Sequence, residues 1–168
     1  QGLMALRESI CRYSERKYGL RYDPRGETVV TVGGSEAIDL AIRALVNPGD
    51  EVIVPQPSFV SYEACVRLAG GVPVIIDCRR EDDFKLRVEQ LEAAVSPKTK
   101  MIIMGYPNNP TGAVMTREDL IPLVRFFEQH DIVVVSDELY AELTYAPATH
   151  CSIASFPSMR DRTIIIGG

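Results

Sequence analysis

The chain has 168 residues, of which 46% are hydrophobic and 24% are charged, a composition that suits one folded domain with a substantial core. Its formal net charge of −5 gives no reason to expect nucleic acid or an anionic lipid surface as a partner. No apolar run approaches the ~20 residues that a membrane-spanning helix needs, and the charged segment 1–19 does not read as a signal peptide.

The cysteines and histidines do not follow the spacing of a metal site. There is no C-x-x-C pair, and only His150 lies beside a cysteine. We therefore expect no bound metal, and we expect reduced thiols in a cytoplasmic protein rather than disulfides. With two histidines in the whole chain, a histidine-centred hydrolase triad is also disfavoured. The residues concerned are Cys11, Cys65, Cys78, Cys151, His130 and His150.

Short β-branched runs alternate with helical patterns along the chain. The elements expected, in chain order, are a helix over about 2–18, a strand at 28–32, a helix at 36–46, a strand at 51–55, a helix at 58–69, a strand at 72–76, a helix at 87–95, a strand at 100–104, a helix at 116–129, and strands at 132–136 and 163–167. Most strand runs are continuously apolar, which is typical of strands covered on both faces. The pattern predicts an α/β fold, a three-layer α/β/α arrangement with a mainly parallel sheet of about six strands and right-handed crossovers.

The helix at 116–129 has the clearest signal. Thr116 can serve as its N-cap, with Asp119 three residues later as a variant of the capping box. One buried stripe then follows helical spacing: Leu120, Leu123, Val124 and Phe127.

Ligands of such sheets bind beyond the carboxyl ends of the strands, so those ends hold the candidate site. After 28–32, Gly34 and Ser35 open a helix whose free amides and positive dipole end could hold an anion such as phosphate. A plain N-cap after a tight turn is the alternative, and it is favoured on this stretch alone. Neither G-x-G-x-x-G nor G-x-x-x-x-G-K-[ST] is present, so the dinucleotide and NTP fingerprints are missing.

Aromatic, acidic and amide side chains follow the other strands. Phe59 and Tyr62 come just after 51–55, where an aromatic face could stack on a flat ring or simply belong to the core. Asp137 emerges directly from a buried run and needs a partner, with Tyr140 one helical turn later, although capping a short helix is also plausible. The stretch "YPNNPTG" follows 100–104, and a tight turn needs its Pro and Gly but not both Asn108 and Asn109.

Together these groups fit a planar, phosphorylated ring that contains nitrogen, and pyridoxal phosphate is the obvious candidate. Its phosphate would go to the helix N-terminus and its ring nitrogen to Asp137. Its ring oxygen would accept hydrogen bonds from Asn109 and Tyr140.

The order "GGSEA", "PSFVSY", "YPNNPTG" and "SDELY" resembles the class I/II aminotransferases, which are fold type I pyridoxal-phosphate enzymes, and within them the aspartate and aromatic aminotransferase branch. The resemblance extends over essentially the whole chain. Each motif is weak alone, but N-N-P-T-G followed about 25 residues later by S-D-E-x-Y is specific in combination.

The resemblance implies a role for each matching residue. Gly34 and Ser35, with the amide of Glu36, would hold the cofactor phosphate. Phe59 would stack on the pyridine ring, where relatives often have Trp or Tyr.

The same resemblance implies contacts around the ring. Asp137 would pair with the pyridine nitrogen, Tyr140 with the ring oxygen, and Asn109 with the ring oxygen and the substrate carboxylate. It also implies a cis peptide bond between Asn109 and Pro110, an isomer that is accessible before proline.

Other family features have no counterpart here. The Schiff-base lysine would lie beyond Gly168, and the chain's lysines, Lys17, Lys85, Lys98 and Lys100, stand elsewhere. The arginine that binds the substrate carboxylate, an arginine that helps hold the phosphate, and the small domain are also missing. We therefore expect residues 1–168 to be the central part of the large, pyridoxal-phosphate-binding domain of an aminotransferase that acts on an amino acid and a 2-oxo acid. We expect this fragment to be inactive, to bind the cofactor weakly or not at all, and to come from a homodimeric parent.

Family topology also places an antiparallel strand between 28–32 and 163–167, and that strand is not in the chain. We expect 28–32 to pair directly with 163–167, to detach, or to borrow a strand from another copy, because unpaired sheet edges favour aggregation.

Two alternatives stay open. Relatives on the same scaffold run β-elimination of C–S bonds or aminocyclopropane-carboxylate synthesis, and these motifs hold cofactor rather than substrate. The second alternative is a non-catalytic α/β binding module, in which Asp137 and Asn109 would have no task.

Overall fold

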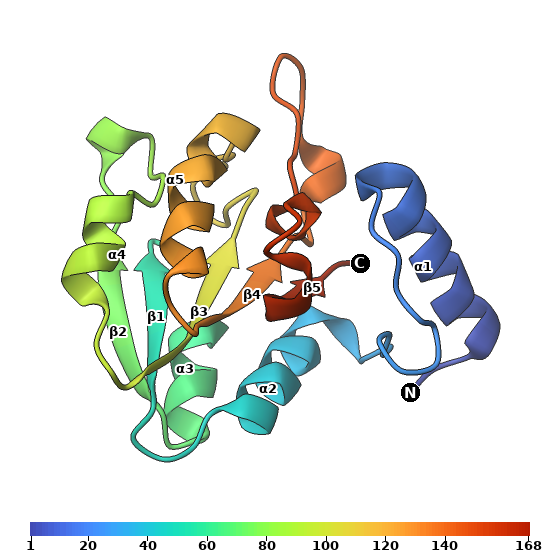
Figure 1. Ribbon diagram of the computed structural model, residues 1–168, viewed down its shortest axis with the longest axis horizontal. Coiled ribbons are helices and arrows are strands. Elements are labelled where there is room, and N and C mark those ends of the chain that lie inside the picture. Colours follow the sequence, from blue (N-terminus) through green and yellow to red (C-terminus); the bar gives the residue numbers. More distant parts are fainter.

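The computed structural model describes all 168 residues. The chain forms a five-stranded sheet with helices packed on both of its faces (Figure 1). Its helices are α1 (Met4–Tyr18), α2 (Gly33–Leu45), α3 (Ser61–Leu68), α4 (Val88–Ala94) and α5 (Arg117–Glu128). Its strands are β1 (Glu51–Gln56), β2 (Val72–Asp77), β3 (Thr99–Gly105), β4 (Val133–Asp137) and β5 (Thr163–Ile166). The α/β class and the helices expected from the sequence are confirmed, with ends that differ by a few residues.

All neighbouring strands are parallel, in the order β2-β1-β3-β4-β5. Gly105 at the end of β3 pairs with Asp137 at the end of β4, and Asp137 pairs with Ile166 at the end of β5. The carboxyl ends of these three strands therefore lie in one row, which places the loops that follow β3 and β4 next to each other.

The strand expected at 28–32 is wrong. Val29 is 59% exposed and Val32 is 89% exposed, and the amide of Val30 donates to the carbonyl of Gln1 at 3.2 Å instead of to a strand. A β-branched run becomes a strand only when a neighbouring backbone pairs with it, and no strand lies on the outer side of β5. Of the three outcomes expected for this segment, detachment from the sheet is the one observed.

The sheet is covered on both faces, which explains its continuously apolar strands. One core cluster lies on the face covered by α4 and α5 and includes Val134 of β4. The other lies on the face covered by α2 and α3 and includes Val135. Successive residues of a strand point to opposite faces, so each central strand supplies apolar side chains to both cores.

The start of α5 confirms the capping pattern. Thr116 Oγ1 accepts a hydrogen bond from the amide of Asp119 at 3.3 Å, and Asp119 Oδ2 accepts one from the amide of Thr116 at 2.8 Å. Lys85 Nζ also contacts Asp119 Oδ2 at 2.7 Å. All four residues of the predicted apolar stripe are buried: Leu120, Leu123, Val124 and Phe127.

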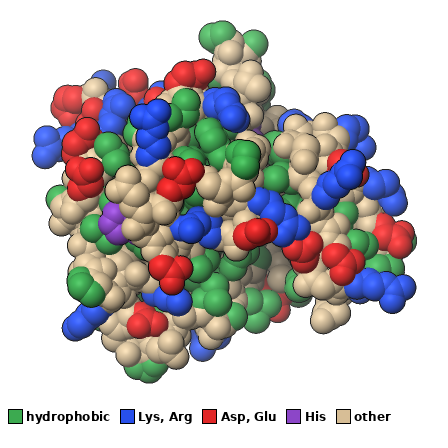
Figure 2. All heavy atoms as spheres, viewed as in Figure 1, with side chains coloured by type: hydrophobic (Ala, Val, Ile, Leu, Met, Phe, Trp, Pro, Cys, Tyr) green, Lys and Arg blue, Asp and Glu red, His purple; other side chains and the backbone are tan.

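Helix α1 lies beside the sheet layers rather than on them, as a separate lobe (Figures 1 and 2). None of its residues belongs to either core cluster, and Leu3, Leu6 and Ile10 are exposed. Two polar contacts join α1 to the loop after β4: Lys17 Nζ contacts Glu142 Oε1 at 2.6 Å, and the Tyr13 hydroxyl donates to the same carboxylate. In the view of Figure 2, side chains of both charge signs are scattered over the surface without a large patch of either.

No helix here has both the length and the apolar character that crossing a bilayer would require. No group of three or more His, Cys, Asp or Glu side chains could hold a metal ion, and the four cysteines are free thiols.

Candidate active site

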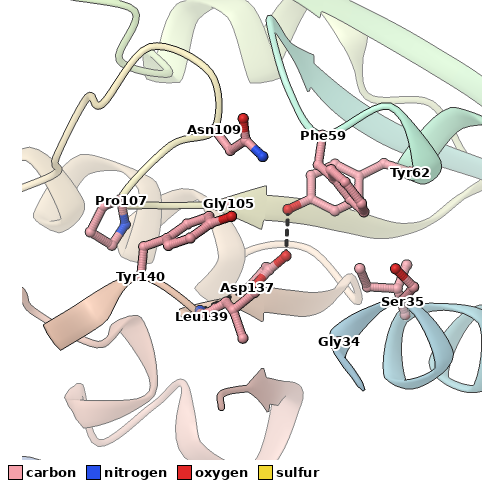
Figure 3. Close-up of a pocket in the computed structure, with 11 residues that line it drawn as sticks. Gly34, Ser35, Phe59, Tyr62, Gly105, Pro107, Asn109, Asp137, Leu139 and Tyr140 are labelled. Carbon is pink, nitrogen blue, oxygen red and sulfur yellow. Dashed lines mark hydrogen bonds between the residues drawn. The ribbon is translucent and has the colours of Figure 1, made fainter. Parts of the chain in front are cut away.

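A cavity lies at the carboxyl ends of the strands, with about 470 Å³ of empty space that is partly open to solvent. Its walls come from the start of α2, the β1–α3 connection with α3, and the segments that follow β3 and β4 (Figure 3). The lining residues are Gly34, Ser35, Ile38, Phe59, Tyr62, Gly105, Pro107, Asn109, Asp137, Leu139 and Tyr140.

Six of the seven residues predicted for the site line this one cavity: Gly34, Ser35, Phe59, Asn109, Asp137 and Tyr140. The seventh, Glu36, does not line it. The carboxylate of Glu36 accepts a hydrogen bond from the amide of Val32, just before α2. The side chain thus serves the start of the helix, while the predicted role of the Glu36 amide stays a prediction.

The start of α2 faces the cavity with Gly34 and Ser35. Gly33 enters the helix at a φ of 78°, a left-handed conformation that glycine adopts without a Cβ clash. No side chain of the cap residue Val32 occupies the N-terminus, and the one acidic side chain of the first turn, Glu36, contacts the Val32 amide just before the helix. The backbone amides of the first turn and the positive end of the helix dipole therefore face the cavity. This arrangement suits an anion.

Asp137 is held by Tyr62, which the sequence indicated only as an aromatic side chain past a strand end and not as a partner of Asp137. The Tyr62 hydroxyl donates to Asp137 Oδ2 at 2.6 Å, and the amide of Leu139 donates to Oδ1 at 3.2 Å (Figure 3). Tyr62 is only 3% exposed. Burial raises the pKa of its phenol well above the usual value, and the charge of Asp137 and the hydrogen bond to it raise it further, so the phenol stays a donor.

Glycine at position 105 makes that hydrogen bond possible. A Cβ at Gly105 would lie 2.5 Å from the Tyr62 hydroxyl oxygen, which is closer than any real contact. The bare backbone of β3 therefore lets Tyr62 reach across from α3 to β4. The sequence held a signal for this contact, because Asp137 follows a buried strand and needs a partner, and Tyr62 is an aromatic donor past the end of β1, which only β3 separates from β4.

The two asparagines of the turn after β3 differ in their contacts. Asn108 Nδ2 donates to the carbonyls of Pro57 and Gly105, each at 3.2 Å, and its Oδ1 accepts from the Thr111 hydroxyl at 2.8 Å. Asn109 makes no side-chain hydrogen bond within the chain and lines the cavity. The predicted cis peptide bond before Pro110 is confirmed.

Two aromatic side chains complete the walls. The Phe59 ring meets the Tyr62 ring edge to face, with centroids 5.8 Å apart and planes at 76°. Phe59 is half-buried, and Tyr140 is partly exposed on the opposite side, next to Asp137. The Tyr140 hydroxyl, like the Asn109 amide, has no hydrogen-bond partner within the chain.

The cavity combines an oriented carboxylate, an aromatic wall, two hydrogen-bonding groups without internal partners and an anion-binding helix end. These features fit a flat, nitrogen-containing ring that carries a phosphate, such as pyridoxal phosphate. None of the eleven lining residues is cationic, so the phosphate would depend on the first turn of α2 and on Ser35.

Comparison with known proteins gives a consistent result. The family "Aminotransferase class I and II" matches residues 1–168. The chain is 44% identical to an aspartate aminotransferase of Geobacillus stearothermophilus over 99% of its own length and 42% of the relative's length. It is 39% identical to aromatic-amino-acid aminotransferase 2 of Thermococcus litoralis, again over 99% of this chain and 43% of the relative.

Solved structures share the fold closely. An aromatic aminotransferase from Pyrococcus horikoshii superposes with a TM-score of 0.96 at 42% identity, covering 99% of this chain and 45% of that one. The aspartate aminotransferase of Thermus thermophilus gives 0.93 at 40% identity, with 99% and 43% covered. The chain thus spans less than half the length of the relatives that it matches. Its whole length nevertheless matches the family, and the chain belongs to the class I and II aminotransferases.

Proposed function

We propose that this chain is the ring-holding part of a pyridoxal-phosphate-dependent aminotransferase, which moves an amino group between an amino acid and a 2-oxo acid. The observation that carries the proposal is the meeting of Asp137, Asn109 and Tyr140 in one cavity with an aromatic wall and the start of α2. When bound, pyridoxal phosphate supplies a ring that withdraws electrons from the substrate's α-carbon. The chain's own residues would hold that ring and set its protonation.

Asp137 would hold a proton on the ring nitrogen. A carboxylate favours the protonated form of a nearby nitrogen base, and a protonated ring withdraws electrons more strongly. Tyr62 occupies one oxygen of Asp137 and the amide of Leu139 contacts the other, which orients the carboxylate before a ligand arrives.

The other side chains would fix the position and tilt of the ring. Phe59 offers an apolar face against which an aromatic ring can stack. Asn109 and Tyr140 offer a donor each for the ring oxygen, and the first turn of α2 offers amides for the phosphate. Together these contacts would orient the reacting bond and exclude water from one face of the ring.

None of the four lysines lines the cavity. We therefore propose that these 168 residues alone bind the cofactor without a covalent bond and do not transaminate. In the full-length protein the amine that reacts with the cofactor would come from outside this chain.

Titration of the 168-residue chain with pyridoxamine 5′-phosphate, followed by ligand fluorescence, tests the proposal. We expect saturable binding that Asp137→Ala weakens by about tenfold or more, since hydrogen bonds to charged groups contribute roughly 1.5–3 kcal/mol. Pyridoxamine without phosphate should bind more weakly, and ATP should not compete. Competition by ATP with no effect of Asp137→Ala would instead support a nucleotide-binding module.

Treatment with pyridoxal phosphate and borohydride tests the second part. Mass spectrometry should show no stoichiometric adduct at a single lysine, and amino-group transfer from aspartate or phenylalanine to 2-oxoglutarate should be absent. Efficient transfer by the 168-residue chain would refute it.

A further inference from the structure

The residue after Asp137 is a buried acid that the proposed chemistry does not use. Glu138 is 4% exposed, and its carboxylate has three partners. Ser136 and Ser152 donate their hydroxyls to Oε1 at 2.9 and 2.7 Å, and His150 Nε2 lies 2.9 Å from Oε2. With its proton on Nε2, the histidine donates to this carboxylate. A buried charge needs such partners, and this one is well provided with them.

Glu138 lies on the side of the sheet opposite to the cavity. Side chains alternate along β4, so Ser136 and Glu138 share the side of Val134. Asp137 shares the side of Val135, where α2 and α3 cover the sheet. The two neighbouring acids are therefore held from opposite sides of the sheet. Asp137 is held by Tyr62 on the cavity side, and Glu138 is held by His150 and Ser152 on the other side.

The Glu138–His150 contact closes a loop that carries part of the cavity wall. Twelve positions separate the two residues, and their side chains are 5% exposed for His150 and 3% for Glu138. Tyr140 lies within this loop, as does Leu139, whose amide donates to Asp137. Opening the contact would loosen the His150 end of the loop and raise the entropy lost on fixing Tyr140.

Further contacts show that the cluster is an anchor between elements. The amide of Glu138 donates to the carbonyl of Ile166 on β5 at 2.8 Å. The Tyr18 ring of α1 meets the His150 ring edge to face, with centroids 5.8 Å apart. The phenol of Tyr22 is a further titratable group close enough to sense the charge of Glu138. No Lys or Arg pairs with Glu138, so the geometry depends on the three donors.

We propose that Glu138 is a positioning residue for the ring site, which it serves by fixing the backbone of Asp137 and the loop that carries Tyr140 from the far side of the sheet. The inference rests on the proposed function, since the group that it positions is the partner of the ring nitrogen.

The test compares two probes on the full 168-residue chain. One is pyridoxamine 5′-phosphate, and the other is its analogue with carbon in place of the ring nitrogen. The unmodified chain should prefer the first by about tenfold or more, because only that probe pairs with Asp137. Glu138→Ala should reduce the preference to about threefold or less. Glu138→Gln should retain it, because its amide oxygen can accept both hydroxyls and its amide nitrogen can donate to the other tautomer of His150.

A matched control separates positioning from loss of stability. Val124→Ala removes buried volume from α5, in the core on the side of the sheet opposite to the cavity, so it should lower the melting temperature and keep the preference. An unchanged preference in Glu138→Ala, alongside a lower melting temperature, would overturn the inference and leave the proposed function standing.

A milder variant covers the case in which Glu138→Ala does not fold. His150→Ala removes one of the two contacts that close the loop and leaves the Ser152 hydroxyl on Glu138, and it should lower the preference by about threefold. Full preference in this variant would also overturn the inference. Absence of any preference in the unmodified chain would contradict the proposed function itself.

Discussion

At the scale of single residues, the molecule gives neighbouring and chemically similar side chains different tasks. Asn108 makes the hydrogen bonds that hold the turn after β3, while Asn109 makes none and lines the cavity. In the same way Tyr62 is buried and bonded to Asp137, whereas Tyr140 lines the cavity with a hydroxyl that has no internal partner. One member of each pair supports the structure and the other is available to a ligand.

Replacing Asn108 should therefore affect mainly stability, and replacing Asn109 should affect mainly ligand binding. Asn108→Ala should lower the free energy of unfolding by about 1–3 kcal/mol, because it leaves partly buried carbonyls without their donors. Asn109→Ala should change the free energy of unfolding by less than about 0.5 kcal/mol. It should instead weaken the binding of pyridoxamine phosphate by about three- to tenfold. Urea unfolding and ligand titration measure the two effects, and equal losses of stability would contradict this division.

Tyr62→Phe should weaken the binding of pyridoxamine phosphate by about tenfold, because Asp137 would lose the donor that orients it. The substitution keeps the ring that packs against Phe59, so the fold should persist. Tyr145→Phe, at an exposed phenol, is the matched control and should leave the affinity unchanged. Wild-type affinity in Tyr62→Phe would show that the contact is only structural.

At the scale of elements, the position of each chemical group depends on the ends of helices and strands. Gly105, Asp137 and Ile166 lie in one paired row because β3, β4 and β5 are in parallel register. A one-residue slip of β4 would turn Asp137 away from the cavity and bring its neighbours to that face. Helix α5 fixes the register from the other side of the sheet, since its buried stripe packs in the core cluster that includes Val134.

The start of α5 offers a pH-dependent test. Burial alone would raise the pKa of Asp119, but Lys85 and Thr116 outweigh it and hold the pKa below its ordinary value. A lowered pKa stabilises the fold above the ordinary value of 3.8, and this contribution is lost as the pH falls below it. Asp119→Asn should lower the free energy of unfolding by about 0.5–1 kcal/mol at pH 7 and by much less at pH 3, as measured by urea unfolding. The same cost at both pH values would contradict the assignment.

The sequence predicted the elements whose signals are local. The capping residues and apolar stripe of α5 are written within fourteen residues, and both are present in the structure. The strand expected at 28–32 failed because its pairing depends on a backbone partner elsewhere, and no local pattern reports that partner. Propensity and pairing are separate conditions for a strand.

For the site, the sequence predicted which strand ends would converge but not every contact there. Asp137 and Asn109 were identified because strand ends and motif spacing are visible in one dimension. The Tyr62–Asp137 hydrogen bond depends on the small space above Gly105, and that space arises only when α3 packs against β3. Glu36 was expected to contribute its amide, and the sequence could not show that its side chain turns to the amide of Val32.

At the scale of the whole molecule, each of the two cores on either side of the sheet holds a buried phenol, Tyr106 in one and Tyr62 in the other, and a third phenol, Tyr18, lies half-buried at the end of α1. Burial is the main cause that raises the pKa of Tyr18, Tyr62 and Tyr106 above the ordinary value of 10.0. A raised tyrosine pKa stabilises the fold fully below pH 10, and this stabilisation is lost as the pH rises, because the phenols ionise more easily in the unfolded chain.

The protein should therefore unfold cooperatively as the pH rises above about 10. Absorbance of ionised tyrosine and near-ultraviolet circular dichroism should change together for these buried phenols, after an earlier phase from exposed ones such as Tyr145. Ionisation of all seven tyrosines in one phase near pH 10, with the fold intact, would contradict their burial.

The separate position of α1 has a consequence for motion. Because none of its residues belongs to either core, the helix can open while both cores stay closed. Amide hydrogens of residues 4–18 should exchange with deuterium faster than those of β3, and salt should speed this exchange by screening the Lys17–Glu142 pair. Mass spectrometry of the labelled chain measures both rates, and equal protection would show that arm and body open as one unit. With different rates, α1 would move as a unit of its own against the rest of the chain. Because α1 contacts the loop that carries Tyr140, the dissociation rate of a bound ring would then depend on how often α1 opens.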